Sequence, residues 1–113
     1  MTDDRSKSTE SLVNDKAWEE LVKNMLRAEM MRRGVSYAAL ADRLAEFGIT
    51  DNELNLRNKV SRGRFTSVFL MQCFMALGVK WIEMPESLAA ATQPGAAQSL
   101  AKRNSHPLSD KGH

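Results

Sequence analysis

The amino-acid sequence predicts an all-α fold, on three observations. Four glycines follow one another at nearly equal intervals, at positions 34, 48, 63 and 78. The apolar residues between the glycines recur with a helical period, and residues that commonly cap helix N-termini stand before these apolar segments. Glycine readily adopts the left-handed conformation that ends a helix. We therefore expect a compact domain of four short helices within residues 15–84, each helix ending at one glycine.

The first two helices are expected at residues 15–33 and 37–47. In the first, a stripe typical of a core-facing side consists of Trp18, Leu21, Val22 and Met25. In the second, Ser36 is a suitable N-cap. It precedes a clear i, i+3, i+4, i+7 stripe formed by Tyr37, Leu40, Ala41, Leu44 and Phe47.

The third and fourth helices are expected at residues 51–62 and 67–77. Thr50 and Glu53 have the spacing of a capping box, and Ile49 with Leu54 has that of a hydrophobic staple. Thr66 or Ser67 begins the fourth helix, where Phe65 and Leu70 repeat the staple spacing.

The segments outside these helices are less regular. Residues 79–84, VKWIEM, mix β-branched, aromatic and charged side chains, which favours a short β-strand or an extended arm. Residues 1–14 are polar, and residues 85–113 are rich in Pro, Ser, Ala and Gly. Both are predicted to be disordered tails, with a fraying helical turn near 86–92.

Composition excludes several classes of function. The net charge of +2 is too small to indicate a polyanionic partner by itself. One cysteine, Cys73, excludes an internal disulfide and favours the reducing cytoplasm, where it is expected to be a buried, inert thiol. There is no signal-peptide pattern, and the longest uncharged run, residues 65–79, is too short to span a membrane.

The predicted domain contains no cluster of residues typical of a catalytic, metal-binding or phosphate-binding site. Both histidines, His106 and His113, lie in the predicted tail and have no partner at metal-ligand spacing. No phosphate-binding glycine loop is present, and Asp42 with Glu46 is an ordinary acidic helix face. We therefore expect no enzyme activity, no cofactor and no metal.

The segment LNLRNKVSRGRF, residues 54–65, carries the strongest functional signal. A helix over residues 51–62 places Leu56 and Val60 inward, and Asn55, Asn58 and Arg62 on the opposite face. Arginine pairs with guanine and asparagine with adenine in the major groove of DNA. These three residues are the predicted contacts to bases.

Basic side chains flank that face, and the predicted contacts to phosphate are Arg57, Lys59 and Arg64. Residues 54–82 contain no acidic residue, whereas Asp51 and Glu53 stand at the start of the third helix. This gradient has a second interpretation, because acids at the start and bases at the end of a helix also complement its macrodipole.

Two stretches of the sequence resemble the helix-turn-helix of phage-repressor and Cro-like regulators. They are YAALADRLAEFGIT and NLRNKVSRGRFTSVFLMQCFMALGV. On this resemblance, residues 37–47 are the scaffold helix and residues 51–62 the recognition helix. The stretch from Trp18 to Ile82 is similar to a small bacterial domain family of unknown function. The interval from Gly48 to Gly63 is longer than in repressors, so individual contacts do not transfer.

The fourth helix is apolar nearly all round, with one stripe at Leu70, Phe74 and Leu77 and another at Val68, Met71 and Met75. So small a core cannot enclose both stripes. The second stripe and Trp81 are therefore a predicted surface for a homodimer or another partner. The alternative is a monomer in which the segment around Trp81 and Ile82 folds back over the stripe.

Together, these patterns favour a small bacterial transcriptional regulator that binds double-stranded DNA with its third helix. The alternative is a protein-protein interaction module that uses the apolar face of residues 67–77 and Trp81 and binds no nucleic acid. RNA binding is a third reading, but it lacks exposed aromatic residues for stacking on bases.

Overall fold

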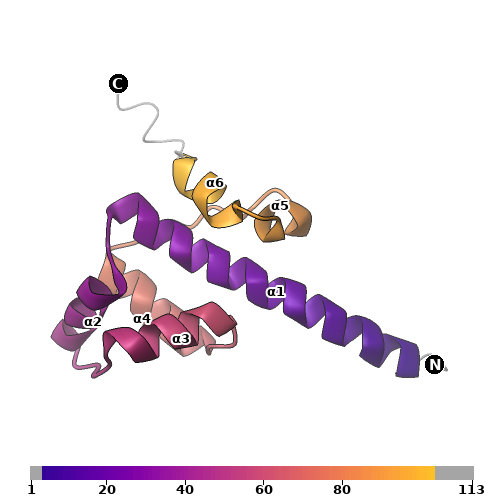
Figure 1. Cartoon of the computed structure of the whole chain (residues 1–113), viewed down its shortest axis with the longest axis horizontal. Helices are drawn as coiled ribbons and strands as arrows, with labels where there is room; N and C mark the ends of the chain where they lie inside the picture. Colours follow the sequence, from indigo (N-terminus) through magenta and orange to yellow (C-terminus); the bar gives the residue numbers. More distant parts are fainter. Residues whose placement is uncertain (1–3, 104–113) are drawn as a thin grey trace.

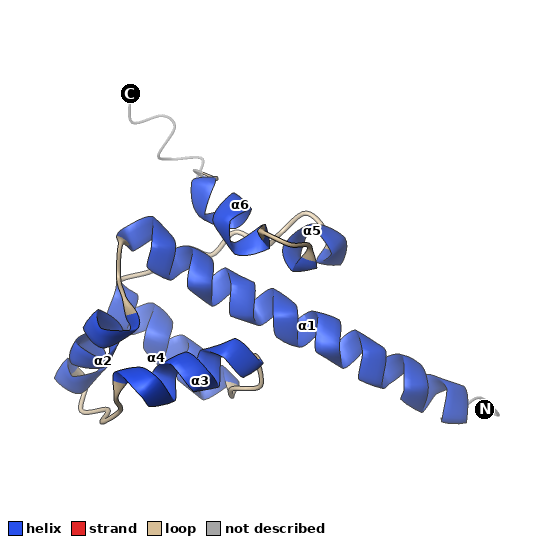
Figure 2. Ribbon diagram, in the orientation of Figure 1, coloured by secondary structure: helices blue, strands red, loops and turns tan. Residues whose placement is uncertain are grey.

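A computed structural model of the chain describes the backbone of residues 4–103 and the side chains of residues 15–103. Figures 1 and 2 show that this range consists of helices joined by loops, without a strand. The helices are α1 (Asp4–Arg33), α2 (Tyr37–Glu46), α3 (Glu53–Arg62), α4 (Ser67–Leu77), α5 (Leu88–Thr92) and α6 (Ala96–Lys102). The predicted all-helical class is confirmed. None of the helices described is both long enough and apolar enough to cross a bilayer.

The long helix α1 divides the molecule. Figure 1 shows α2, α3 and α4 on one side of it and α5 with α6 on the other, and the N-terminal part of α1 projects beyond both groups. The main core lies between α1 and the three helices α2–α4. Its fully buried large side chains are Leu26, Leu40, Leu44, Leu56, Val60 and Cys73.

Helix caps match the sequence signals at most positions. The Ser36 hydroxyl accepts a hydrogen bond from the Ala39 N–H, and the Thr66 hydroxyl accepts one from the Phe69 N–H. All four glycines predicted to end helices have positive φ angles. The glycine spacing therefore identified the C-terminal ends of the first four helices correctly.

The start of α3 differs from the prediction. Its N-cap is Asn52, whose side chain accepts a hydrogen bond from the Asn55 N–H, so the predicted Thr50–Glu53 capping box is wrong. The predicted Ile49–Leu54 staple is wrong as well. Ile49 packs against the core, but Leu54 is 64% exposed, because a helix that begins at Glu53 turns Leu56 inward instead.

The prediction for α1 also needs correction. The helix extends back to Asp4, so most of the predicted N-terminal tail, residues 4–14, is helical. The polar composition of this segment suggested a tail, but it contains neither Gly nor Pro to interrupt a helix. Leu21 is buried as expected, whereas Trp18 is 51% exposed and does not belong to the core.

The predicted C-terminal tail is wrong for residues 88–102, which form α5 and α6 and pack on α1. Three alanines, Ala91, Ala96 and Ala97, are buried in this contact. Alanine side chains let backbones approach closely, but they produce no strong apolar stripe in the sequence. The connection over residues 79–87 contains no strand. Residues 104–113, with both histidines, lie outside the described range.

Candidate nucleic-acid interface

Two buried side chains fix the orientation of α3. Leu56 and Val60, one turn apart, are both fully buried in the core, as predicted. At the end of the helix, Gly63 has φ +68° and is itself buried. A Cβ atom at this position would lie 2.5 Å from the backbone oxygen of Glu19, so α3 ends in direct contact with the backbone of α1.

The three predicted base contacts lie on the exposed side of α3. Asn55, Asn58 and Arg62 are all exposed, and Ser61 is exposed beside them. The Asn55 backbone N–H donates to the Asn52 side chain, and the Asn55 side chain is one of the groups that lower the pKa of the Asp51 carboxylate, so Asn55 is partly engaged. Within the described part of the chain, the side chains of Asn58 and Arg62 have no hydrogen-bond or ion-pair partner. These two side chains are the ones that α3 leaves available for a ligand.

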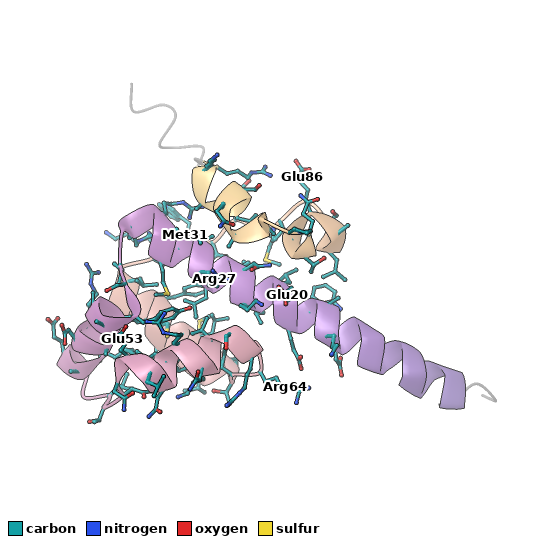
Figure 3. The ribbon with its side chains drawn as sticks, in the orientation of Figure 1. Glu20, Arg27, Met31, Glu53, Arg64 and Glu86 are labelled. Atoms are coloured by element: carbon teal, nitrogen blue, oxygen red, sulfur yellow. The ribbon has the colours of Figure 1, made fainter. Side chains whose placement is uncertain are left out.

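The three predicted phosphate contacts each have an acidic partner. Arg57 pairs with Glu53 at 2.5 Å, Lys59 with Asp51 at 3.2 Å, and Arg64 with Glu19 at 3.4 Å. Figure 3 shows Glu53 and Arg64 at opposite ends of α3, with Arg64 on the side toward α1. The cations are thus distributed along the helix as expected, but they are not free charges.

Two of these cations also lie over aromatic rings. The Arg57 guanidinium carbon is 5.2 Å from the centre of the Tyr37 ring, and the Lys59 ammonium is 4.6 Å from that of Phe69. Lys59, predicted as a phosphate contact, therefore also packs within the folded chain. It connects α3 to α4 and to the loop before α3, whereas Arg57 connects α3 to the start of α2.

The Asp51 carboxylate is part of the same arrangement. Partial burial acts to raise its pKa, but the Asn52 N–H, the Lys59 ammonium and the Asn55 amide together hold that pKa below its ordinary value. The carboxylate is therefore charged near neutral pH and remains beside Lys59. A phosphate that approaches Lys59 would meet this negative charge.

The sequence contained a signal for only part of this pairing. Glu53 and Arg57 have the i, i+4 spacing at which opposite charges meet on a helix. Asp51 with Lys59, and Glu19 with Arg64, are separated by turns of the chain and meet only in the folded molecule. Net charge along the sequence therefore overestimated how basic this surface is.

A second surface lies on α4. Val68, Met71 and Met75 are 64%, 48% and 64% exposed, so the predicted second stripe is uncovered and the alternative in which the Trp81 segment folds over it is wrong. A shallow depression here is lined by Phe47, Ser67, Val68, Met71, Gln72 and Met75, which we call the α4 patch. Phe47, at the end of α2, was expected in the core but is 52% exposed. Trp81 is exposed as well, but it does not line the patch.

The opposite face of α4 belongs to the core. Phe74 and Leu77 are buried and Leu70 packs against the core, as the first stripe predicted. Cys73 is fully buried, and burial raises the pKa of its thiol to about 12. The thiol therefore stays protonated and unreactive at neutral pH.

Comparison with known proteins identifies the domain. Residues 18–82 match the family described as a domain of unknown function, DUF6471. The chain belongs to the DUF6471 family. No curated protein and no solved structure matches it.

The DUF6471 match covers the part of the chain that carries both surfaces. It includes the C-terminal half of α1, all of α2, α3 and α4, and the connection as far as Ile82. The exposed face of α3 and the α4 patch both lie within it. The helices α5 and α6 lie beyond the matched residues.

Proposed function

We propose that this DUF6471 protein binds double-stranded DNA and acts as a small bacterial transcriptional regulator, with α3 in the major groove. The observation that carries the proposal is the exposed face of α3, where Asn58 and Arg62 have no partner within the described residues and no acidic side chain follows Glu53. Amide and guanidinium groups on one helix face are suited to reading base edges.

The arrangement of α2 and α3 supports this proposal. The two helices pack together and are joined by residues 47–52, and α3 is held by buried side chains on one side only. In the proposed helix-turn-helix, α2 is the scaffold helix and α3 the recognition helix, which leaves the outer face of α3 free to enter a groove. Asn55, Asn58 and Arg62 then lie toward the bases.

Phosphate contacts require an exchange of partners. Arg57 and Arg64 are exposed, and ion pairs of this kind stabilise a folded protein by only about 0–1 kcal/mol. Exchanging the carboxylate partner for a phosphate therefore costs these two arginines little folding free energy. Arg57 also lies over the Tyr37 ring, so Arg64 is the more available of the two arginines. Lys59 is the least available, because its side chain is the least exposed of the three and its ammonium lies over the Phe69 ring.

The experiment measures affinity for a pool of duplex DNA sequences as salt is varied. Binding at low salt that weakens steeply as salt rises supports the proposal. Arg62→Ala should weaken binding to the preferred sequence by about 1–3 kcal/mol and relax the preference at one base pair. The matched control is Arg103→Ala, which removes an arginine on the α6 side of the molecule and should leave affinity unchanged. Absence of binding at low salt, or equal effects of the two variants, would overturn the proposal.

A second candidate function has one observation in its favour. The α4 patch is an exposed apolar surface, and such surfaces often bind other proteins. In this interpretation the protein is an interaction module that binds no nucleic acid. Glutamate at Met71 and Met75 would then abolish function, whereas neutralising Arg57, Arg62 and Arg64 would not.

A further inference from the structure

An open groove of about 630 Å³ lies where the C-terminal end of α3 meets α1. Figure 3 shows one charged side chain from each side of it, Glu20 on α1 and Arg64 beyond the end of α3. The contact between Gly63 and the Glu19 backbone fixes the two sides relative to each other. We call it the α1–α3 groove, and its charged lining residues are Lys16, Glu19, Glu20, Arg62 and Arg64.

Both acids in the lining already have a cation beside them. Glu19 pairs with Arg64 across the groove at 3.4 Å. Glu20 pairs with Lys23, one turn further along α1, at 2.9 Å. The negative charges of the groove are therefore compensated within the folded chain.

Two cations on opposite sides of the groove are not compensated. Lys16 on α1 and Arg62 in the last turn of α3 are both exposed, and neither has a hydrogen-bond or ion-pair partner within the described part of the chain. Lys16 stands three and four residues before the two acids, a spacing at which ion pairs form on a helix, but both acids are paired elsewhere. An anion that enters the groove therefore meets uncompensated positive charge from α1 and from α3.

From this charge distribution we propose that the α1–α3 groove takes the phosphodiester backbone of the DNA strand that α3 contacts, with Lys16 as a phosphate contact on α1. The inference rests on the proposed DNA binding. Arg62 belongs both to the exposed face of α3 and to the lining of the groove, so a strand whose bases it contacts passes beside the groove. A linear polyanion can reach both free cations, because its charges repeat along its length.

The position of Lys16 on α1 suits this contact. Lys16 lies one turn before Glu19, the residue that meets Gly63, and Figure 1 shows that the N-terminal part of α1 continues past the end of α3. Lys16 therefore stands beyond the end of the proposed recognition helix. Phosphate contacts that flank such a helix fix its register on the duplex and carry no sequence information.

The first experiment compares the affinity of lysine variants for duplex DNA as salt is varied. Lys16→Ala should weaken binding to all sequences alike, by several-fold at low salt, and should reduce the slope of log affinity against log salt by about 0.9, the value for one phosphate. Lys16→Arg keeps the charge and should bind like the unaltered chain. The matched control is Lys102→Ala, which removes an exposed lysine from α6, on the other side of α1, and should leave the slope unchanged.

The second experiment locates the contact on the DNA. Single phosphates of the preferred duplex are replaced, one at a time, by neutral methylphosphonates. One replacement, beside the base pair at which Arg62→Ala relaxes the preference, should weaken binding of the unaltered chain. The same replacement should have no effect on Lys16→Ala, because that variant has already lost the contact.

The outcomes separate this inference from the proposed function. Unchanged affinity and salt slope in Lys16→Ala, with Arg62→Ala still weakened, would overturn the inference and leave the proposed function standing. Equal losses in Lys16→Ala and Lys102→Ala, or a methylphosphonate profile that is the same with and without Lys16, would overturn it as well, because the effect would then come from net charge. Absence of any binding to duplex DNA would overturn both, and binding of polyglutamate in its place would assign the groove to acidic protein segments.

Discussion

Lys59 makes two contacts at once, with its ammonium 3.2 Å from the Asp51 carboxylate and 4.6 Å from the centre of the Phe69 ring. In the sequence it is one of several cations in a basic run, and the helical pattern places it beside the face that carries Arg62 without showing that it has partners. The folded chain separates them, because Arg62 points away from the core and Lys59 toward it. Two side chains of the same charge on one helix thus differ in role, because Lys59 packs within the molecule and Arg62 is exposed to solvent.

Gly63 is the other residue whose role depends on its neighbours. Its positive φ is a property that it shares with Gly48, but only Gly63 has the backbone of α1 beside it. A residue with a side chain would therefore meet two costs at this position, the left-handed backbone and the lack of room for a Cβ atom.

Gly63→Ala should lower the free energy of unfolding by about 2 kcal/mol or more, because the new Cβ atom collides with the Glu19 carbonyl. Gly48→Ala, at φ +81° with nothing within 4 Å of the new atom, should lower it by only about 1 kcal/mol. Urea unfolding of both variants provides the comparison. Equal losses would show that the approach of α3 to α1 is not tight.

Among the elements, α5 and α6 are held against α1 by hydrogen bonds from polar side chains of α1, and alanines are buried in the contact. The Asn24 amide donates to the Ala91 carbonyl at 2.8 Å, and the Arg32 guanidinium donates to the Leu100 carbonyl at 2.6 Å. The Leu100 carbonyl also accepts a hydrogen bond from the Arg103 N–H at the C-cap of α6, so Arg32 shares an acceptor at the end of that helix. Alanine buries little apolar area, so this pair of helices should be the less stable part of the described structure.

Asn24→Leu should release α5 and α6 while the rest of the domain stays folded. The leucine leaves the buried Ala91 carbonyl without its donor, at a cost of about 1–3 kcal/mol. Hydrogen exchange of the amides in α6 should become roughly tenfold faster or more, and that of the amides in α3 and α4 should not change. Equal acceleration in all of these helices would mean that α5 and α6 unfold only together with the core.

For the molecule as a whole, most of the positive charge on and just after α3 is paired. Arg57, Lys59 and Arg64 meet acids from the first turn of α3, from the loop before it and from α1 respectively, whereas Arg62 has no ion-pair partner within the described residues. The protein therefore combines a small net charge of +2 with only one unpaired arginine on the predicted DNA-binding face, within the residues described. The electrostatic field of the protein should therefore attract DNA only weakly. Removal of one acidic side chain should then change the affinity for DNA measurably.

Glu53→Gln should strengthen binding to DNA several-fold at low salt. The change removes a negative charge near the proposed phosphate position and frees Arg57, so the affinity should also fall more steeply with rising salt. Glu86→Gln is the matched control, because Glu86 pairs with Arg103 on the other side of α1 and should not affect binding. Titrations at several salt concentrations test both variants, and weaker binding by Glu53→Gln would count against the proposed orientation of α3.

Local patterns in the sequence were sufficient to predict the helical class, the C-terminal ends of α1 to α4 and the inward faces of α3 and α4. These follow from local causes, since a glycine ends a helix through its own backbone and an apolar stripe requires only helical periodicity. The same local signals predicted correctly that Leu56 and Val60 are buried and that Val68, Met71 and Met75 lie on a separate face of α4.

The folded chain was needed to show which cations are paired, which apolar side chains remain exposed, and that α5 and α6 pack on α1. Asp51 reaches Lys59, and Glu19 reaches Arg64, through turns of the chain that no local pattern specifies. Phe47 fits the apolar stripe of α2 and is nevertheless exposed, because the core ends before it. These three features share one cause, because burial and ion pairing depend on distances in space between residues far apart in the chain.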